Sequence, residues 1–295
     1  MMEGIITFFR EVACKVPYED RYETYPDEGI LLLPESYSDE GEPSRLVISC
    51  HGAGGTVETD DSQVVWQVMT KYLLANGFAV TDMAGLPKEY CKKYGIDPFN
   101  NVGAPLAVDS YVSGYEWCVS NYNLKKEALI HGASMGGISS TNVVLSGRIP
   151  ILAQTGFCPV LDAYNEIYLH PWSDGLPKTA LEKMYSLGDG KYDEDKIAPF
   201  NPMTNPGIRN YPVPVRFWQC ADDIVVSPEV TGTFVEMICS YGGDAKLTLL
   251  PSGGHEPQLY GPPIENPSGI DVYRGEKLEI TEAVEGVFRT LLEFR

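Results

Sequence analysis

The chain has 295 residues, of which 43% are hydrophobic and 21% are charged, so it can bury a large core and is not a disordered polypeptide. This length suits one large α/β domain, or a domain with an insertion, better than two independent domains. The formal net charge of −19 disfavours a role on nucleic acid or on anionic membranes, because these polyanions repel an acidic surface.

The first half of the sequence alternates between short apolar runs, which predict strands, and amphipathic stretches, which predict helices. The expected strands are 29–33, 45–50 and 78–81. The run 45–50 is almost continuously apolar and ends at a cluster of glycines, which is typical of a strand buried on both faces. A helix with an apolar face should follow it and end at Gly77, and a second helix should begin at Pro105.

The same alternation continues in the second half. The further expected strands are 128–131, 150–153, 213–219 and 246–250. The expected helices are one that ends at about 145, one over 230–241 and one over 284–292. Parallel strands need such crossovers, so the pattern predicts an α/β fold with a mostly parallel central sheet and helices on both faces.

One stretch breaks this rhythm. Residues 158–211 contain several aromatic side chains and prolines but no clear strand. We expect this cap segment to be inserted into a single domain formed by residues 1–295, over the carboxyl edge of the sheet, where α/β folds bind ligands. His170 and Trp172 lie within it and are candidate substrate contacts.

The sequence predicts neither a membrane span nor a signal peptide. No apolar run approaches the ~20 residues needed to cross a bilayer, and segment 1–16 lacks a basic start and a small-residue cleavage site. The seven cysteines are an odd number and include no CxxC pair, which favours reduced, mostly buried thiols in a cytoplasmic protein.

The sequence Gly132-Ala-Ser-Met-Gly136 matches the pattern G-x-S-x-G, directly after one expected strand and directly before an expected helix. A serine on such a sharp turn has a strained backbone and an exposed hydroxyl, and flanking glycines avoid clashes between strand and helix. The next N–H, at Met135, begins the helix and can stabilise an oxyanion. Ser134 is therefore the candidate nucleophile, with a chance glycine-rich loop as the alternative.

A serine hydroxyl needs a base to remove its proton, and the chain has four histidines. His131 lies in an expected strand and should be structural, while His51 should brace the glycine-rich loop that it opens. His255 ends the glycine-rich loop 251–255 after the last expected strand, and from there it can reach Ser134. We therefore expect His255 to be the base, with an ordinary surface histidine as the alternative.

The base in turn needs a carboxylate that holds its tautomer. Asp222 and Asp223 both follow the strand expected at 213–219, and either can orient His255. A position in a tight turn just beyond the strand favours Asp223, and Asp222 can instead brace that turn. The order Ser134, Asp223, His255 is the order found in serine hydrolases of this topology.

An oxyanion hole needs a second backbone N–H group. The sequence His51-Gly-Ala-Gly-Gly55 follows the first buried strand, and its glycines allow the backbone to approach a substrate closely. We expect Ala53 or Gly54 to donate together with Met135, unless the loop is a plain strand-to-helix turn.

Taken together, these motifs resemble those of the α/β-hydrolase superfamily. The matching segments frame about residues 45–260 and are His51-Gly-Ala-Gly-Gly55, Gly132-Ala-Ser-Met-Gly136, Asp222-Asp223-Ile-Val-Val226 and Gly253-Gly-His255. The chain looks most similar to the prolyl-oligopeptidase-like and dienelactone-hydrolase-like branches, which include esterases with a small cap. The acid of these branches often lies in a Gly-x-x-Asp-x-x-Val-Pro pattern. Cys220 and Ser227 replace the glycine and the proline here, and the spacing supports Asp223.

The resemblance implies a serine hydrolase that acts through an acyl-enzyme, with Ser134 as nucleophile and His255 as base, and without a metal or organic cofactor. The spacing of residues gives no zinc cluster, P-loop or dinucleotide fingerprint. We expect a small-molecule ester as substrate, such as an acetyl or feruloyl ester of a plant-type sugar. An aminopeptidase or amidase is the alternative in the same class, and a catalytically inactive binding or scaffold protein is the alternative in another class.

Overall fold

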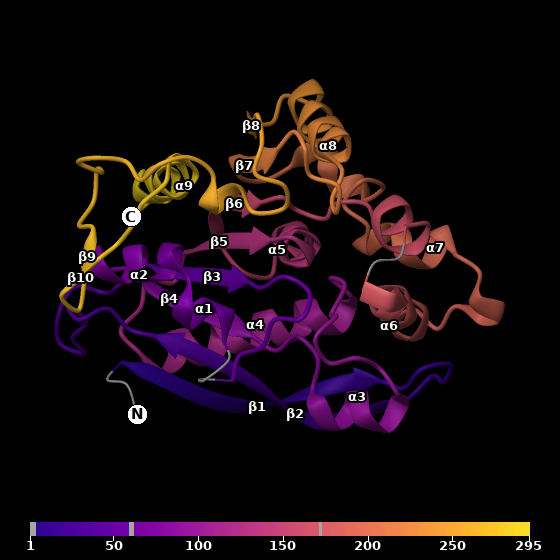
Figure 1. Ribbon diagram of the computed structural model, residues 1–295. Helices are drawn as coiled ribbons and strands as arrows, with labels where there is room; N and C mark the ends of the chain where they lie inside the picture. Colours follow the sequence, from indigo (N-terminus) through magenta and orange to yellow (C-terminus); the bar gives the residue numbers. More distant parts are fainter. Residues whose placement is uncertain (1–3, 59–61, 171–172) are drawn as a thin grey trace.

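A computed structural model describes residues 4–58, 62–170 and 173–295. Its centre is an eight-stranded sheet with the strand order β1-β2-β4-β3-β5-β6-β7-β8 (Figure 1). The strands are β1 (Ile5–Lys15), β2 (Tyr22–Leu32), β3 (Leu46–Cys50), β4 (Ala79–Met83), β5 (Ala128–Ala133), β6 (Ile151–Phe157), β7 (Val215–Cys220) and β8 (Ala245–Leu250). Strands β3 to β8 are parallel, whereas β1 and β2 form an antiparallel hairpin that pairs with β4. The expected mostly parallel sheet is confirmed.

Helices cover both faces of this sheet. They are α1 (Gln63–Trp66), α2 (Val68–Ala75), α3 (Lys88–Tyr94), α4 (Pro105–Asn121), α5 (Met135–Ser146), α6 (Leu176–Met184), α7 (Glu194–Ile197), α8 (Pro228–Ser240) and α9 (Glu282–Leu292). Leu73 of α2 and Phe288 of α9 belong to one buried apolar cluster. Tyr111 of α4 and Phe234 of α8 belong to another, so the sheet separates two apolar layers.

Several elements differ from the expectations for local reasons. The sequence does not predict β1, because most of its side chains are only partly buried or exposed and form no clean apolar pattern. Gln67, with an extended ψ of 135°, divides the helix expected before Gly77 into α1 and α2. Strand β6 continues beyond 153 because its polar residues find partners inside the core: the Gln154 amide donates to Ser140 Oγ, for example.

The cap segment (158–211) joins β6 to β7 and contains no strand among its described residues. It consists of short helices: a π-helical turn (Ala163–Tyr168), α6, α7 and 3-10 turns at Ser173–Gly175, Gly188–Gly190, Ala198–Phe200 and Pro206–Asn210. Its buried side chains, such as Ile167 and Leu181, form a third apolar cluster with Met135 and Ile138 of α5. Figure 1 shows α6 and α7 beyond the arrowhead of β3.

Within the described ranges, no helix combines the length and the apolar character that crossing a bilayer requires. All seven cysteines are free thiols, and Cys239 is the exposed one among them, while the other six are buried.

Candidate active site

Ser134 lies on the tight turn between β5 and α5, at the carboxyl edge of the sheet. Its backbone has φ 53° and ψ −122°, a conformation that residues other than glycine rarely adopt. Two hydrogen bonds of 2.9 Å fasten the turn: the Ser134 N–H donates to the Phe157 carbonyl, and the Val160 N–H donates to the Ser134 carbonyl. The strained turn is therefore held by the chain that leaves β6.

Crowding explains the two glycines of the turn. A Cβ atom on Gly132 would lie 2.3 Å from the Gly136 carbonyl oxygen, and one on Gly136 would lie 1.8 Å from the Cys50 carbonyl oxygen. Both contacts are with backbone atoms, which cannot move aside without shifting β3 or α5. Only glycine at both positions lets the helix start this close to the sheet.

Side chains from three loops meet at this turn. The Ser134 Oγ lies 2.8 Å from His255 Nε2, and His255 Nδ1 lies 2.9 Å from Asp223 Oδ2. Because a carboxylate only accepts hydrogen bonds, the ring proton lies on Nδ1, and the Nε2 lone pair accepts the serine O–H. The His255 side chain is 25% exposed and that of Asp223 is fully buried, so a substrate can reach the ring but not the carboxylate.

The turn after β7 holds Asp223 in place. Its Oδ1 accepts hydrogen bonds from the N–H groups of Val225 and Val226, at 2.9 and 3.1 Å. Burial alone would raise the pKa of Asp223, but the hydrogen bonds from His255 and from these N–H groups outweigh burial and place the pKa below its ordinary value. The carboxylate therefore stays ionised and can fix the His255 ring.

Asp222 contacts the backbone of the histidine loop instead of the imidazole. Its Oδ1 accepts a hydrogen bond of 2.8 Å from the Gly254 N–H, and its Oδ2 accepts a longer one of 3.4 Å from the Gly253 N–H. Of the two aspartates that the sequence offers, the structure brings Asp223 to the ring and uses Asp222 to hold the loop that carries His255.

The glycine-rich loop 51–55 runs beside the serine. A Cβ atom on Gly52 would lie 3.3 Å from the Ser134 Cβ. The Gly54 N–H donates to the Phe99 carbonyl at 3.1 Å and so is already occupied. This bond joins two loops that are distant in sequence, and it corrects the expectation that Gly54 can serve as an oxyanion donor.

Two other N–H groups are free at this place. Those of Ala53 and Met135 have no acceptor among the described residues. Met135 is the first residue of α5, and a helix leaves its first N–H groups without an internal partner. Neither N–H group is therefore engaged by another described residue.

The remaining histidines differ from His255 in environment. The buried His51 ring has its Nδ1 3.1 Å from the Asp82 carboxylate on β4, which anchors the start of the glycine-rich loop. His131 Nδ1 lies 2.9 Å from Thr155 Oγ1, and burial lowers the pKa of His131 to about 4. Both are parts of the fold, as the sequence indicates.

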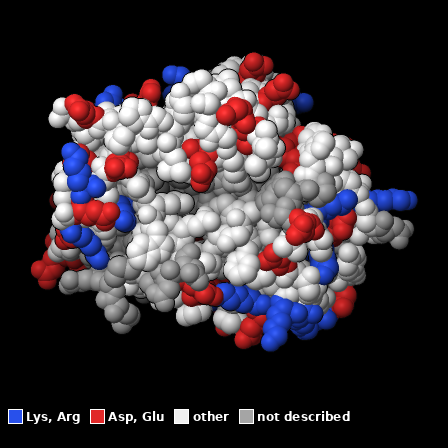
Figure 2. All heavy atoms as spheres, in the orientation of Figure 1, with Lys and Arg blue, Asp and Glu red and all other residues white. Residues whose placement is uncertain are grey.

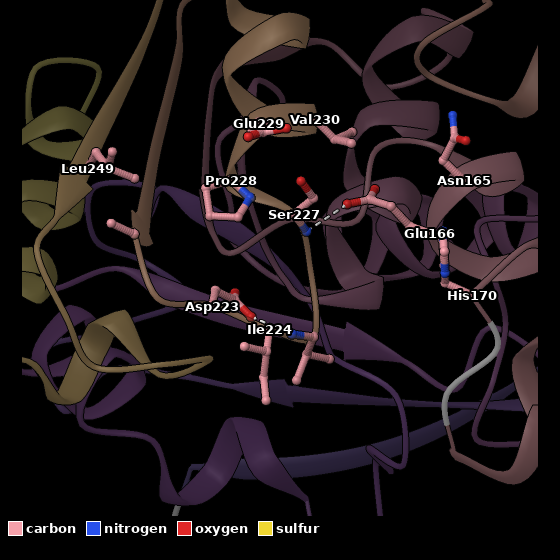
Figure 3. A pocket seen from close by; sticks show the side chains of 12 residues that line it. Asn165, Glu166, His170, Asp223, Ile224, Ser227, Pro228, Glu229, Val230 and Leu249 are labelled. Atoms are coloured by element: carbon pink, nitrogen blue, oxygen red, sulfur yellow. Dashed lines mark hydrogen bonds between the residues drawn. The ribbon is translucent and has the colours of Figure 1, made fainter.

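A cavity of about 730 Å³ lies between the cap segment and the turn after β7 (Figure 3). Its lining includes His170 from the cap segment and Asp223 and Ile224 from the turn, but neither Ser134 nor His255. His170 therefore borders a cavity that approaches the acid rather than the nucleophile. Trp172, the other expected substrate contact, lies outside the described residues.

Glu166 links the cap segment to the turn that carries Asp223. Its Oε2 accepts from the N–H groups of Leu161 and Asp162 at 2.8 and 3.0 Å, and its Oε1 accepts from the Ser227 N–H at 3.2 Å (Figure 3). Burial raises the pKa of Glu166 to about 7, although these N–H groups favour the carboxylate. Sequence reasoning misses this residue, because a lone glutamate outside any recognisable motif carries no signal.

A smaller cavity, of about 200 Å³, adjoins the nucleophile turn. Its lining is mainly apolar and includes Val68, Met69, Ala133, Phe157, Leu259 and Val284. Ala133 directly precedes Ser134, and Leu259 lies on the segment that follows His255. The cavity thus adjoins the nucleophile turn at Ala133, although neither Ser134 nor His255 lines it.

Comparisons by sequence find no relative: no protein-family model matches the chain, and no curated protein matches it. Solved structures are similar in fold. The acylaminoacyl peptidase of Pyrococcus horikoshii superposes with a TM-score of 0.64 at 12% identity, over 98% of this chain and 41% of that chain. A puromycin-hydrolyzing peptidase of Mycobacterium tuberculosis gives 0.63 at 16%, over 97% and 39%.

Est1E from Butyrivibrio proteoclasticus gives a TM-score of 0.59 at 16% identity, over 97% of this chain and 99% of that chain. The chain thus spans about two fifths of the two peptidases and nearly all of Est1E. Identities this low show the fold and not the activity. With its parallel strands β3 to β8, its serine turn after β5 and its helices on both faces, this chain has the α/β-hydrolase fold.

Proposed function

We propose that the protein is a serine hydrolase that cleaves carboxylic esters of small molecules. The observation that carries the proposal is the hydrogen-bonded series from Asp223 through His255 to Ser134, with distances of 2.9 and 2.8 Å. A base within hydrogen-bonding distance of a serine, itself oriented by a buried carboxylate, is what activates a hydroxyl for attack on a carbonyl.

In the proposed reaction, Ser134 Oγ attacks the ester carbonyl carbon while His255 Nε2 accepts the hydroxyl proton. The N–H groups of Ala53 and Met135 stabilise the charge on the carbonyl oxygen. His255 then donates the proton to the leaving alcohol oxygen, which leaves an acyl group on Ser134. Water attacks this acyl-enzyme as His255 accepts its proton, the acid departs, and Ser134 Oγ recovers its proton. Asp223 remains ionised throughout.

The surroundings of the site favour a compact, uncharged acyl group. The cavity of about 200 Å³ beside Ala133 is mainly apolar, and an apolar cavity of ~150 Å³ holds one benzene ring. The net charge of −19 disfavours anionic substrates. An acetyl or feruloyl ester of a sugar meets both conditions. We also propose a cytoplasmic location, because all seven cysteines are free thiols.

Turnover of matched substrates tests the ester assignment. We expect the purified protein to hydrolyse p-nitrophenyl acetate faster than aminoacyl p-nitroanilides. Amide hydrolysis is the second candidate, because two of the similar folds are peptidases. Faster turnover of the anilides would replace the esterase with an amidase.

Labelling with a fluorophosphonate tests the nucleophile. We expect the wild-type chain to be labelled and Ser134→Ala to be neither labelled nor active, with a loss of at least ~10³-fold in kcat. Ser146→Ala, at the other end of α5, is the matched control and should keep both properties. A wild-type chain that takes up no label would indicate a catalytically inactive binding protein.

A further inference from the structure

A thiol lies beside the imidazole of the candidate active site. Cys158 follows β6, and its Sγ lies 3.9 Å from His255 Nε2 and donates to the His255 carbonyl oxygen at 3.3 Å. One ligand atom from each of Cys158, Asp223 and His255 lies within 4.8 Å of the other two. The serine mechanism assigns no role to this thiol.

The distances suit a thiophilic metal ion. In a tetrahedral zinc site, Zn–S and Zn–N bonds of about 2.3 and 2.1 Å place sulfur and nitrogen about 3.6 Å apart. The 3.9 Å between Cys158 Sγ and His255 Nε2 needs to shorten by only a few tenths of an ångström. The Ser134 Oγ, 2.8 Å from the same Nε2, and water can fill the remaining positions.

The imidazole already has the outer partner that zinc-binding histidines use. Such a histidine donates its other ring N–H to a carboxylate or a carbonyl, which fixes the ring and raises its basicity. His255 donates Nδ1–H to Asp223, which is in turn held by two backbone N–H groups. The arrangement that makes His255 a base therefore also makes it a ready metal ligand.

The thiol is held in position by the backbone. Cys158 has a φ of 38°, which is rare for a residue with a side chain, and its N–H donates to the Trp218 carbonyl on β7 at 2.9 Å. The cysteine is only 3% exposed, but the neighbouring His255 side chain is 25% exposed. The imidazole is therefore partly open to an ion from solvent, and the sulfur lies beside it.

We propose that Cys158 Sγ and His255 Nε2 bind a thiophilic divalent cation such as Zn²⁺, and that the bound ion inhibits hydrolysis. On binding, a metal–sulfur bond replaces the S–H bond and the proton goes to solvent, so no oxidation or reduction takes place. The ion occupies the lone pair that has to accept the Ser134 proton. The inhibition rests on the proposed function, whereas the binding does not.

Cadmium, a thiophilic stand-in for zinc, tests the binding directly through the ultraviolet absorption of its bond to a thiolate. Cys239→Ser is the reference chain, because it lacks the exposed thiol. We expect its absorption band to saturate at one equivalent of Cd²⁺ and to disappear with EDTA. Adding Cys158→Ser or Cys158→Ala should remove the band, with near-ultraviolet circular dichroism as the check on folding. A reference chain without a band, or an unchanged band in both double variants, would overturn the proposal.

Measuring ester turnover in the presence of Zn²⁺ tests whether the bound ion inhibits hydrolysis. We expect the Zn²⁺ concentration that halves ester turnover to be at least tenfold lower for the reference chain than for the chain with Cys158→Ser added. Turnover by the reference chain should recover with EDTA. Equal sensitivity of the two chains would contradict the proposal. A Cys158-dependent cadmium band in a protein that hydrolyses no ester would leave the metal site standing and reject the proposed function instead.

Discussion

Two aspartates that are adjacent in the sequence hold different parts of the same histidine loop. Asp223 accepts a hydrogen bond from the ring of His255, whereas Asp222 accepts from the backbone N–H groups of Gly253 and Gly254. One carboxylate therefore sets the tautomer of the imidazole, and the other sets the position of the loop that carries it.

We expect these roles to separate on mutation. Asp223→Asn should lower kcat for p-nitrophenyl acetate by ~10³- to 10⁴-fold, because an amide in this place favours the wrong tautomer of His255. Asp222→Asn removes a loop contact and should lower kcat by about tenfold or less. The measurement is kcat together with the thermal midpoint of each variant. A larger loss of kcat for Asp222→Asn would mean that the acid has been misassigned.

A matched pair of glycines tests the crowding at the nucleophile turn. Gly136→Ala places a Cβ 1.8 Å from the Cys50 carbonyl oxygen, and should destabilise the fold by at least ~3 kcal/mol or prevent folding. Gly232→Ala, in α8, meets no atom within 4 Å and should stabilise by about 0.5–1 kcal/mol through helix propensity. Urea unfolding of both variants gives the two values, and a Gly136→Ala chain of wild-type stability would contradict the close approach of α5 to β3.

At the scale of elements, Glu166 joins the cap segment to the turn after β7. Because burial raises the pKa of Glu166 to about 7, from about 4.3 in an unfolded chain, the folded protein binds more protons than the unfolded chain between these values. The contribution of Glu166 to the free energy of unfolding should therefore fall as pH rises from about 4.5 to 7, and should stay constant above that.

Urea unfolding at pH 5, 6, 7 and 8 measures this contribution. Each pKa unit corresponds to about 1.4 kcal/mol, so the stability of the wild type relative to Glu166→Gln should fall by on the order of 3 kcal/mol over this range. Glu229→Gln, an exposed position at the same cavity, should follow the wild type. If the free energies of unfolding of wild type and Glu166→Gln changed equally with pH, the assigned pKa of Glu166 would be wrong.

At the scale of the whole molecule, acidic residues outnumber basic ones, by 41 to 22. In the face that Figure 2 shows, acidic and basic side chains both lie around a hollowed middle that carries few charged side chains. With a net charge of −19, the protein should repel an anionic ester and should exert no net electrostatic force on a neutral one.

Salt should reveal this repulsion. Raising NaCl from 20 to 500 mM should increase kcat/KM for p-nitrophenyl hydrogen succinate several-fold, because ions screen the field of the protein, and should leave kcat/KM for p-nitrophenyl acetate nearly unchanged. The acetate ester is the internal control for general effects of salt. Equal responses of the two esters would show that the charge does not act at the site.

Features of this fold that depend on neighbouring residues can be predicted from the sequence, whereas features that depend on contacts between distant segments cannot. The turn at Ser134 is encoded locally, by glycines between an apolar strand and a helix, so its place in the fold is predictable. The engagement of Gly54 by Phe99 and the position of Cys158 beside His255 depend on contacts between distant segments. No spacing within the chain reveals them.

The two hydrogen bonds that join Ser134, His255 and Asp223 span long stretches of chain. Ser134 and His255 are separated by 121 positions and Asp223 and His255 by 32, and the residues sit on loops of β5, β7 and β8. A refolding chain must close loops of this length and align the parallel strands before the serine has a base. Catalytic competence is therefore a late event in folding, and helical signal in circular dichroism should return well before the first turnover.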